Sequence, residues 1–273
     1  MKKGNRMIIT ILGLIAIAIA LILIIGIFSY DQKIEKEKKA LFATTKTSVS
    51  ISEEDLNGLP KLMKDYLLKV GVVGKPRYCN VVFRQSGTIK TDPKKDWLQF
   101  KATQYVSSEN SGFIWKAKAF PIFIRDKFQN GQGEVKVNLL GVKNLAVIST
   151  PETDQSSLGR YFGELLWFPM GFLDDDITWV EIDDETIKGT IVKGNLTFEG
   201  YFLFNKEGLI TAFRGKRYRD LALENFRGEA QDYVLMSDIL IPKTMTAIWE
   251  LEQGDLEYFK AAIIGYEVID SDQ

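Results

Sequence analysis

The sequence predicts a mainly β, antiparallel domain attached to a single N-terminal transmembrane helix. Two patterns support this fold class. Residues Met7–Phe28 form 22 consecutive uncharged positions, almost all Ile, Leu, Ala or Gly. From Arg77 onwards, short runs with apolar residues at every second position alternate with turn sequences. The first pattern is typical of a membrane span and the second of β-strands.

The apolar run predicts an uncleaved membrane anchor. A helix of this length is about 33 Å long and can cross a hydrocarbon core of about 30 Å. Lys2, Lys3 and Arg6 precede it, so we expect residues 1–6 in the cytoplasm and the C-terminal domain outside, although lysines also follow the run. A cleaved signal peptide is the alternative, but its apolar core is about 7–15 residues and its cleavage site needs small residues, whereas this run ends in Phe28.

Composition narrows the function of the exported part. Without the three basic residues before the anchor, 32 Lys and Arg face 36 Asp and Glu, a net charge of −4. This balance argues against a nucleic-acid partner and gives no reason to expect tight binding to anionic lipid. Cys79 is the only cysteine, so no intramolecular disulfide forms, and histidine is absent. The commonest general base and the commonest metal ligand are therefore missing.

Residues 29–52 are predicted to be a stalk and linker. Tyr30 to about Lys46 is rich in Lys and Glu and can continue the anchor helix outward, and Thr44–Ser52 is rich in Ser and Thr. A short helix is then predicted over Pro60–Val70, with Pro60 in its first turn and Gly71 after its end. Its apolar stripe should pack on the sheet that follows and consists of Leu62, Met63, Tyr66, Leu67 and Val70.

The remaining chain, within a single domain 53–273, is predicted to be one antiparallel meander. Strands this close in sequence pair antiparallel, because a parallel pair needs a crossover of about a dozen residues. Turn sequences such as Asn130-Gly131 and Lys193-Gly194-Asn195 separate them. The predicted strands are Val81–Gly87, Trp97–Val106, Phe113–Ala119, Ile122–Phe128, Glu134–Leu140, Leu145–Ser149, Thr178–Ile182, Thr186–Ile191, Leu196–Phe204, Leu209–Tyr218, Asn225–Met236, Ile241–Leu251 and Leu256–Val268.

The segment Thr153–Phe172 interrupts the strands and predicts a second helix in the exported part. Asp154 or Ser156 can cap it, and Pro169 ends it. The helix is apolar over most of its circumference, so we expect it against the concave face of the sheet. Alternation along Leu196–Phe204 and Ile241–Leu251 places Phe, Trp and Met on one face. That face can close on itself, on helices or around a cavity.

Several motifs resemble an uncharacterised prokaryotic membrane-anchored family, over about Leu59 to Tyr266. They are Leu59-Pro60, Tyr66-Leu67, Gly71-Val72-Val73-Gly74-Lys75-Pro76, Phe113-Ile114-Trp115-Lys116-Ala117, Arg125-Asp126, Gly131-Gln132-Gly133, Leu140-Gly141, Glu164-Leu165-Leu166-Trp167-Phe168-Pro169, Ile241-Pro242 and Trp249. The resemblance implies a curved antiparallel meander forming an incomplete (half) β-barrel, with helices packed in or on its concave face, similar to periplasmic lipoprotein carriers. It brings no activity with it.

Charged clusters have structural and functional interpretations. Asp174-Asp175-Asp176 offer hard oxygen ligands for Ca²⁺, but their spacing does not follow the twelve-residue calcium loop, so solvated acids are the simpler interpretation and no metal or cofactor is expected. Arg214, Lys216, Arg217 and Arg219 can hold an anionic head group or line a solvated face. Arg125 and Asp126 are neighbours in a strand, so they should point to opposite faces.

Searches for catalytic groups fail. Without histidine, neither a Ser–His nor a Cys–His pair exists, and no Gly-x-Ser-x-Gly elbow occurs. We therefore predict a non-enzymatic, membrane-tethered domain that binds a lipid or an acylated or otherwise apolar ligand at the outer face of the cell membrane. The alternative is a structural or protein-interaction domain with a filled core, and the protein partner is unknown. The candidate ligand-binding residues are Trp115, Phe123, Trp167, Phe168, Phe202, Trp249 and Arg217.

Overall fold

The computed structural model describes residues 2–43, 49–90 and 92–270 and has one 13-stranded antiparallel sheet. Each predicted strand is present, and no strand end differs from its predicted position by more than three residues. The strands are β1 Cys79–Ile89, β2 Leu98–Ser107, β3 Gly112–Ala119, β4 Ile122–Gln129, β5 Gln132–Leu139, β6 Lys143–Ile148, β7 Ile177–Asp183, β8 Thr186–Lys193, β9 Leu196–Phe204, β10 Ile210–Arg219, β11 Ala222–Met236, β12 Ile239–Leu251 and β13 Gly254–Asp270.

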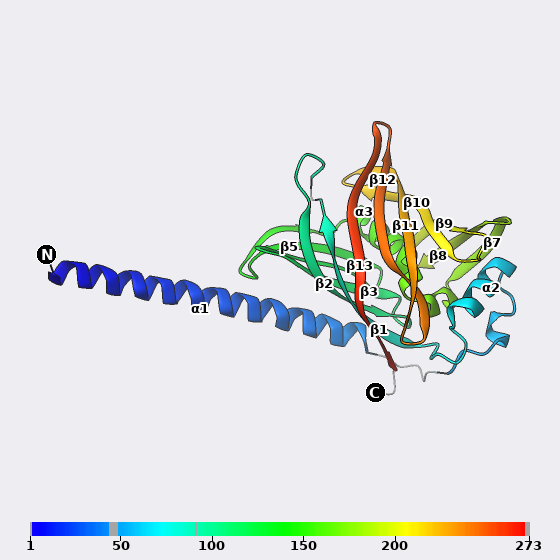
Figure 1. Cartoon of the computed structure of the whole chain (residues 1–273), viewed down its shortest axis with the longest axis horizontal. Coiled ribbons are helices and arrows are strands. Elements are labelled where there is room, and N and C mark those ends of the chain that lie inside the picture. The colour runs from blue at the N-terminus through cyan, green and yellow to red at the C-terminus, as the bar shows by residue number, and fades with distance from the viewer. Residues whose placement is uncertain (1, 44–48, 91, 271–273) are drawn as a thin grey trace.

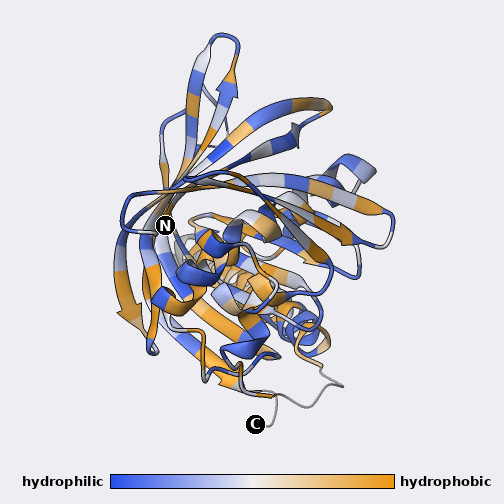
Figure 2. Cartoon of the chain, turned by 90° about the vertical axis from the view of Figure 1, so that its right-hand side faces the viewer, coloured by the Kyte–Doolittle hydropathy of each residue, from blue (hydrophilic) through white to orange (hydrophobic). Residues whose placement is uncertain are grey.

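The sheet is a meander that is joined to itself by its first and last strands. Its order is β6-β5-β4-β3-β2-β1-β13-β12-β11-β10-β9-β8-β7, and β1 pairs antiparallel with β13 from Cys79–Asp270 to Ile89–Phe259. Strands β6 and β7, which follow each other among the strands of the chain, are therefore the two edges. The sheet curls without closing, which confirms the predicted half-barrel (Figures 1 and 2).

The connection between β6 and β7 fills the concave face. It consists of α3 Pro151–Gly163 and the 3-10 helices η2 Glu164–Trp167 and η3 Pro169–Leu173. Helix α3 packs against β4 and β5 on one side and against β9 and β10 on the other. The predicted burial of this segment is confirmed, because most of its side chains from Leu158 onwards are buried.

The predicted cap of α3 is wrong. The helix begins earlier, after Thr150, whose Oγ1 accepts a hydrogen bond from the Thr153 N–H at 3.3 Å, and Pro151 occupies the first turn, where its missing N–H costs nothing. The two residues expected to cap it bind the sheet instead. Asp154 accepts a hydrogen bond from the Gly133 N–H of β5 at 2.7 Å. Ser156 donates one to the Tyr218 carbonyl of β10 at 2.9 Å.

Two glycines allow α3 to approach the sheet closely. A Cβ atom on Gly159 would lie 2.2 Å from the Phe198 ring, and one on Gly163 would lie 2.7 Å from the Phe213 ring. Neither position tolerates a side chain without moving the helix away from β9 and β10. Aromatic rings thus take the place of helix side chains in this part of the core.

Helix α2, Lys61–Val70, packs over the end of the half-barrel near η3. Tyr66 is fully buried, with its ring 6.0 Å from Phe172 of η3 and 5.9 Å from Phe204 of β9. Gly71 ends the helix with φ of +81°, a conformation that favours glycine. A short 3-10 helix, η1 Glu54–Leu56, precedes α2. The predicted packing of this helix on the sheet is confirmed.

The N-terminal helix α1, Lys2–Leu41, is continuous and lies outside the barrel. It is the one helix in the described part of the chain that is long and apolar enough to cross a membrane, and residues 7–29 are mostly exposed. Beyond them, Tyr30, Ile34 and Leu41 are buried against the convex face, with Ile114 of β3 and Phe123 of β4. The predicted helical continuation is thus present to Leu41, and the linker residues 44–48 lie outside the described residues.

Ion pairs fix the end of α1 to the convex face. Asp31 lies 2.8 Å from Lys116 of β3, and Glu37 lies 3.1 Å from Lys127 and 3.5 Å from Arg125 of β4. Arg125 also pairs with Glu134 of β5. Helix α1 and the half-barrel are therefore in direct contact over several turns.

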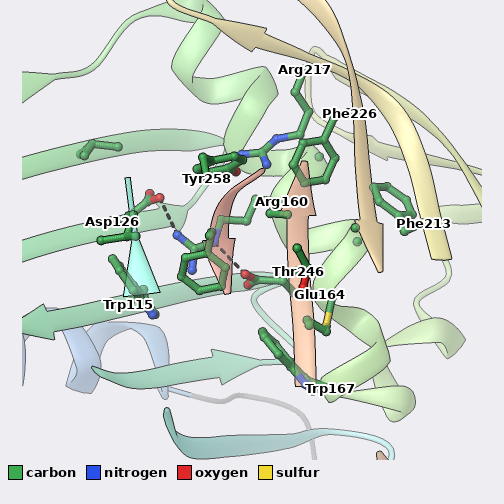
Figure 3. Close-up of a pocket in the computed structure, with 18 of the residues that line it drawn as sticks. Trp115, Asp126, Arg160, Glu164, Trp167, Phe213, Arg217, Phe226, Thr246 and Tyr258 are labelled. Carbon is green, nitrogen blue, oxygen red and sulfur yellow. Dashed lines mark hydrogen bonds and ion pairs between the residues drawn. The ribbon is translucent and has the colours of Figure 1, made fainter. Parts of the chain in front are cut away.

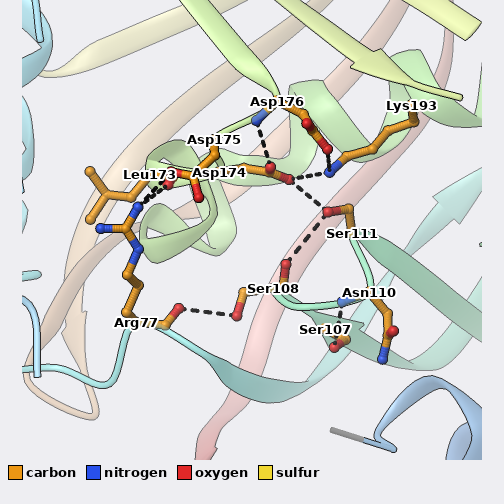
Figure 4. Close-up of polar contacts among 10 residues, drawn as sticks. All are labelled: Arg77, Ser107, Ser108, Asn110, Ser111, Leu173, Asp174, Asp175, Asp176 and Lys193. Atoms are coloured by element: carbon orange, nitrogen blue, oxygen red, sulfur yellow. Dashed lines mark hydrogen bonds and ion pairs between the residues drawn. The ribbon is translucent and has the colours of Figure 1, made fainter. Parts of the chain in front are cut away.

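The acids at the start of β7 form a structural network (Figure 4). Asp174 accepts a hydrogen bond from Ser111 at 2.6 Å and pairs with Lys193 at 2.7 Å, while Asp175 pairs with Arg77 at 2.8 Å. These contacts join the β2–β3 turn, β8 and the segment before β1. Within the described residues, no group of three His, Cys, Asp or Glu side chains is arranged to hold a metal ion.

The concave core should dominate stability. Phe202 is fully buried with its ring 4.9 Å from Phe213, whereas its neighbour Tyr201 is 37% exposed on the other face. We expect Phe202→Ala to lower the free energy of unfolding by about 3–5 kcal/mol and Tyr201→Ala by no more than about 1 kcal/mol. Urea unfolding of the detergent-solubilised full chain, followed by tryptophan fluorescence, measures both. Equal losses of unfolding free energy for the two variants would contradict the assignment of Phe202 to the buried face and Tyr201 to the exposed face.

Candidate functional site

A cavity of about 380 Å³ lies between α3 and the concave face of the sheet (Figure 3). Both halves of the sheet line it. Strands β1 and β3–β5 contribute Trp115, Ile124 and other apolar residues, and β10–β13 contribute Phe213, Phe226 and further residues. The lining is mostly apolar, and its charged members are Asp126, Arg160, Glu164 and Arg217.

Small residues and a β-bulge leave this space open. Gly228 of β11 and Ala247 of β12 line the cavity where larger side chains would fill it. Tyr258 and Phe259 of β13 both line it, although neighbours in a regular strand point to opposite faces. Ala247 of β12 pairs with Phe259 and Ile248 pairs with Glu257, so Tyr258 is the extra residue of a β-bulge, and such a bulge re-aims side chains locally.

Arg160 of α3 organises the polar side of the cavity. Its guanidinium group donates to Asp126 of β4 at 2.6 Å and to Glu164 at 2.9 Å (Figure 3). It also donates to the Gln104 side-chain oxygen at 3.2 Å, and the Gln104 amide donates in turn to Glu164 at 2.7 Å. The guanidinium lies over the Trp115 ring at 5.1 Å. Arg160 thus bonds to all three polar partners, and two of these partners, Gln104 and Glu164, also bond to each other.

The electrostatic environment keeps Arg160 charged. Burial by itself lowers the pKa of the guanidinium, but the carboxylates of Glu164 and Asp126 outweigh burial, so the pKa lies above its ordinary value. The side chains of Arg160, Asp126 and Glu164 are 13, 17 and 15% exposed. One cation paired with two carboxylates leaves this side of the cavity with one uncompensated negative charge.

One oxygen of the Asp126 carboxylate is unpaired. Its second oxygen binds Arg160, but Oδ1 is buried and has no hydrogen-bond partner among the described residues. A buried polar atom without a partner is unfavourable, so this oxygen is a cost to the fold that the pairing of the second oxygen with Arg160 offsets.

Arg217 of β10 lines the opposite part of the cavity. Its Nε donates to the Ser156 carbonyl at 3.0 Å, and its guanidinium lies over the rings of Phe226 at 4.6 Å and Trp249 at 5.8 Å. Within the part of the chain that the structure describes, no carboxylate lies within 4 Å of it. Unlike Arg160, it therefore forms no ion pair in the described part of the chain, although Glu224 of β11 lies opposite it in the register of β10 and β11.

The structure brings some of the predicted binding residues together. Trp115, Trp167 and Arg217 line the cavity. Trp115 donates from its indole N–H to Gln85 at 2.8 Å, and Trp167 donates to the Pro242 carbonyl at 2.9 Å. Both indoles are thus fixed at their polar atoms and expose apolar surface to the cavity.

Other predicted residues lie elsewhere. Trp249 does not line the cavity but packs on two residues that do, with its ring 5.4 Å from Phe226 and 5.7 Å from Tyr258. Phe168 and Phe202 are buried in the core outside the lining. Phe123 is on the convex face, where its ring lies 5.5 Å from Tyr30 of α1. These three phenylalanines contribute to packing in this structure.

Sequence reasoning missed Asp126, Arg160 and Glu164 as a group. A signal for two of them was present, since Arg160 and Glu164 are four residues apart on a helix that was expected to be buried. Buried charges are usually paired with each other or with a further partner. The third member, Asp126, comes from a distant strand and had no such local signal.

The Arg160 network should stabilise the fold strongly. Arg160→Met leaves two mostly buried carboxylates without a cation, so we expect the free energy of unfolding to fall by about 3–5 kcal/mol. Arg214→Met is the matched control, because Arg214 is 51% exposed on the outer face and 3.8 Å from Glu250. We expect that change to cost no more than about 1 kcal/mol. Urea denaturation of both variants tests this, and a small loss for Arg160→Met would contradict the structural role of the network.

Three solved structures are similar to this chain at low sequence identity. A putative outer membrane lipoprotein-sorting protein domain from Vibrio parahaemolyticus is 9% identical, with a TM-score of 0.43 and coverage of 69% of this chain and 85% of that one. A LolA superfamily protein from Nitrosomonas europaea is 12% identical, with a TM-score of 0.42 and coverage of 75 and 92%. A DUF1329 family protein from Desulfovibrio piger is 11% identical, with a TM-score of 0.46 and coverage of 76 and 92%.

No curated protein matches the sequence. Residues 49–261 match a family described as a family of unknown function, DUF6544. This range covers most of the chain and includes the half-barrel from β1 into β13, with the cavity and the Arg160 network. The resemblance drawn from the sequence motifs to an uncharacterised family is thereby confirmed: this chain belongs to the DUF6544 family.

Proposed function

We propose that this protein is a membrane-tethered, non-enzymatic binding domain for a lipid or another apolar moiety with an anionic group. The observation that carries the proposal is the apolar cavity of about 380 Å³ on the concave face. Ligand sites in proteins are concave, mostly apolar and about 300–1,000 Å³ in volume. Core packing that left no continuous void would have favoured a structural domain instead.

The volume and the lining favour one alkyl chain. An engineered apolar cavity of about 150 Å³ stays dry and binds benzene, so a cavity of this size has room for a longer apolar group. Trp115, Phe213 and Met245 provide polarizable apolar surface on several sides. The volume lies near the lower end of the range for ligand sites, which supports a single acyl chain rather than a complete multi-chain lipid.

Arg217 supplies the contact for a head group. It lines the cavity, it is stacked on aromatic rings, and it forms no ion pair with a carboxylate of the described residues. A guanidinium in this position can donate charge-assisted hydrogen bonds to a carboxylate or phosphate. We therefore propose that the ligand is an amphiphile whose anionic end lies at Arg217.

The side chains in the cavity support binding rather than catalysis. Its two carboxylates are both paired with Arg160, and no Ser, Cys, Lys or His side chain lines it in the part of the chain that the structure describes. A hydrolase would need an activated nucleophile or a water positioned by a free base.

The tether completes the proposal. Residues 7–28 are proposed to span the membrane, with residues 1–6 in the cytoplasm and 53–273 as the exported domain joined by 29–52. The apolar helix α1 and the basic residues before it support this arrangement. The cavity would then open outside the cytoplasm, close to a source of lipid.

Filling the cavity should abolish binding without unfolding the protein. A Cβ atom on Gly228 would have no neighbour nearer than 3.9 Å, so Gly228→Leu places its side chain in the cavity at little steric cost. Gln231→Leu is the control, because Gln231 is exposed on the same strand. Native mass spectrometry of the detergent-extracted full chain with added palmitate should show an adduct for the wild type and for Gln231→Leu, and none for Gly228→Leu. A folded wild type without any adduct would support the structural alternative.

Removing the positive charge should affect anionic ligands selectively. Arg217→Met should weaken binding of laurate by about tenfold or more, because a hydrogen bond to a charged group contributes about 1.5–3 kcal/mol. Binding of methyl laurate should change little. Titration calorimetry on the full chain in detergent compares the two ligands, with Arg214→Met as the control on the outer face. Equal losses for acid and ester would show that Arg217 acts only through packing.

A further inference from the structure

Two turns of the sheet lie beside the apolar part of α1. The β5–β6 turn, Leu140–Val142, contacts the helix so closely that a Cβ atom on Gly26 would lie 2.5 Å from Val142 Cγ2. A Cβ atom on Gly141 would lie 2.8 Å from the Gly26 carbonyl oxygen. The β3–β4 turn, Ala119–Ile122, is its neighbour, because the Leu140 N–H donates to the Pro121 carbonyl at 3.0 Å. We call these two turns the rim turns.

The rim turns lie at the level of the outer membrane boundary if α1 spans the bilayer. Gly26 is within the apolar run Met7–Phe28, two residues before its end, and thus about 3 Å along the helix from the boundary. An independent estimate places Phe120 at the same level along the axis of α1. Lys118 of β3 lies 3.8 Å from Asp31, and the two residues from Lys118 to Phe120 span about 7 Å, the rise of about four to five helical residues. Phe120 is therefore level with about residue 26.

The side chains of the rim turns suit this position. Phe120 is 83% exposed, more than any other large hydrophobic residue that the structure describes, and Val142 is 47% exposed. Exposed apolar side chains of this size are unfavourable in water, whereas segments that lie in the membrane interface bury Phe and other apolar side chains at the boundary of head groups and acyl chains. Lys143 follows Val142 and is exposed, and a lysine beside an apolar contact can place its ammonium among head groups.

The attachment of α1 leaves the rim turns no freedom to move away. The helix is continuous from Lys2 to Leu41, and its last turns are fixed to the convex face by Tyr30, Ile34 and two carboxylates. A half-barrel held in this way cannot leave the membrane surface without breaking the helix or these contacts.

From these observations we infer that the rim turns form a second membrane contact, in which Phe120 and Val142 insert into the head-group region of the same leaflet that surrounds the end of α1. This inference rests on the proposed membrane anchor. The partner is a lipid surface, recognised through apolar insertion rather than charge. The contact would hold the half-barrel in one orientation at the bilayer.

The experiment places a fluorescent reporter at the rim. The full chain with Cys79→Ala and Phe120→Cys is labelled with an NBD dye and reconstituted into phosphatidylcholine vesicles that carry a nitroxide quencher near the head group. Leu235→Cys is the matched control, since Leu235 is 68% exposed near the β11–β12 turn, on the side of the domain remote from the N-terminus of α1 (Figure 1). We expect lipid quenching and a blue-shifted emission at position 120, and neither at position 235.

A second pair of variants tests the contact with the helix. Gly26→Leu would force the β5–β6 turn away, whereas Gly13→Leu makes the same change in α1 where no atom lies within 4 Å. Quenching at position 120 should fall for Gly26→Leu and stay unchanged for Gly13→Leu. Flotation of the vesicles separates the two hypotheses. Protein that floats without quenching at position 120 would overturn the rim contact and leave the anchor intact, and protein that does not float would overturn the anchor itself.

Discussion

The pairing of β1 with β13 is the constraint on which the rest of the structure depends. It joins residues 170 to 191 positions apart, from Cys79–Asp270 to Ile89–Phe259, and makes one sheet out of two meanders. Because these strands are in the middle, β6 and β7 become the edges, and the segment that connects them has to bridge the two ends of the sheet. In this structure it does so across the concave face, where α3 packs on β4 and β5 and on β9 and β10. The cavity follows, since it is bounded by α3 and by strands from both sides of the β1–β13 pair.

A charged side chain buried in an apolar core needs a counterion, and this requirement separates the roles of Arg160 and Arg217. Arg160 is covered by α3 and the sheet, so it requires Asp126, Glu164 and Gln104, and its charge is used within the protein. Arg217 is supported by aromatic rings and a carbonyl and forms no ion pair in the described part of the chain. For this reason we propose the second arrangement, and not the first, as the contact for an anionic ligand. The cavity thus has one polar side at Arg160 whose charges are paired within the protein and another at Arg217 that has no ion pair in the described part of the chain.

The sequence predicted the strands well because alternation is a local property that each strand shows by itself. The pairing of β1 with β13 had no local sequence signal, since no short turn connects these strands and any two edge strands of a meander can pair. The binding residues show the same limit. Strand β4 carries Phe123 on its convex face and Asp126 on its concave face, opposite to a simple reading of apolar inside and charged outside. The two side chains have these positions because Phe123 packs on Tyr30 of α1 outside the barrel and Asp126 pairs with Arg160 inside it. The sequence of β4 alone does not predict either contact. The Thr150–Pro151 start of α3 was missed for a different reason, because stronger-looking caps follow it.

The two faces of the sheet serve separate purposes, and this separation has a consequence for ligand exchange. The convex face holds α1 through Tyr30, Ile34 and their partners, while the concave face holds α3 and the cavity. Helix α1 therefore packs on the outer side of β3 and β4, and its buried partners Ile114 and Phe123 are not among the residues that line the cavity. Strand β3 connects them, because Ile114 faces the anchor while its neighbours Phe113 and Trp115 face the concave side. With α1 as the proposed membrane anchor, this packing fixes the distance between the cavity and the membrane. Such a fixed distance would suit the proposed amphiphilic ligand better if that ligand enters from, or remains partly in, the lipid than if it is collected from solution.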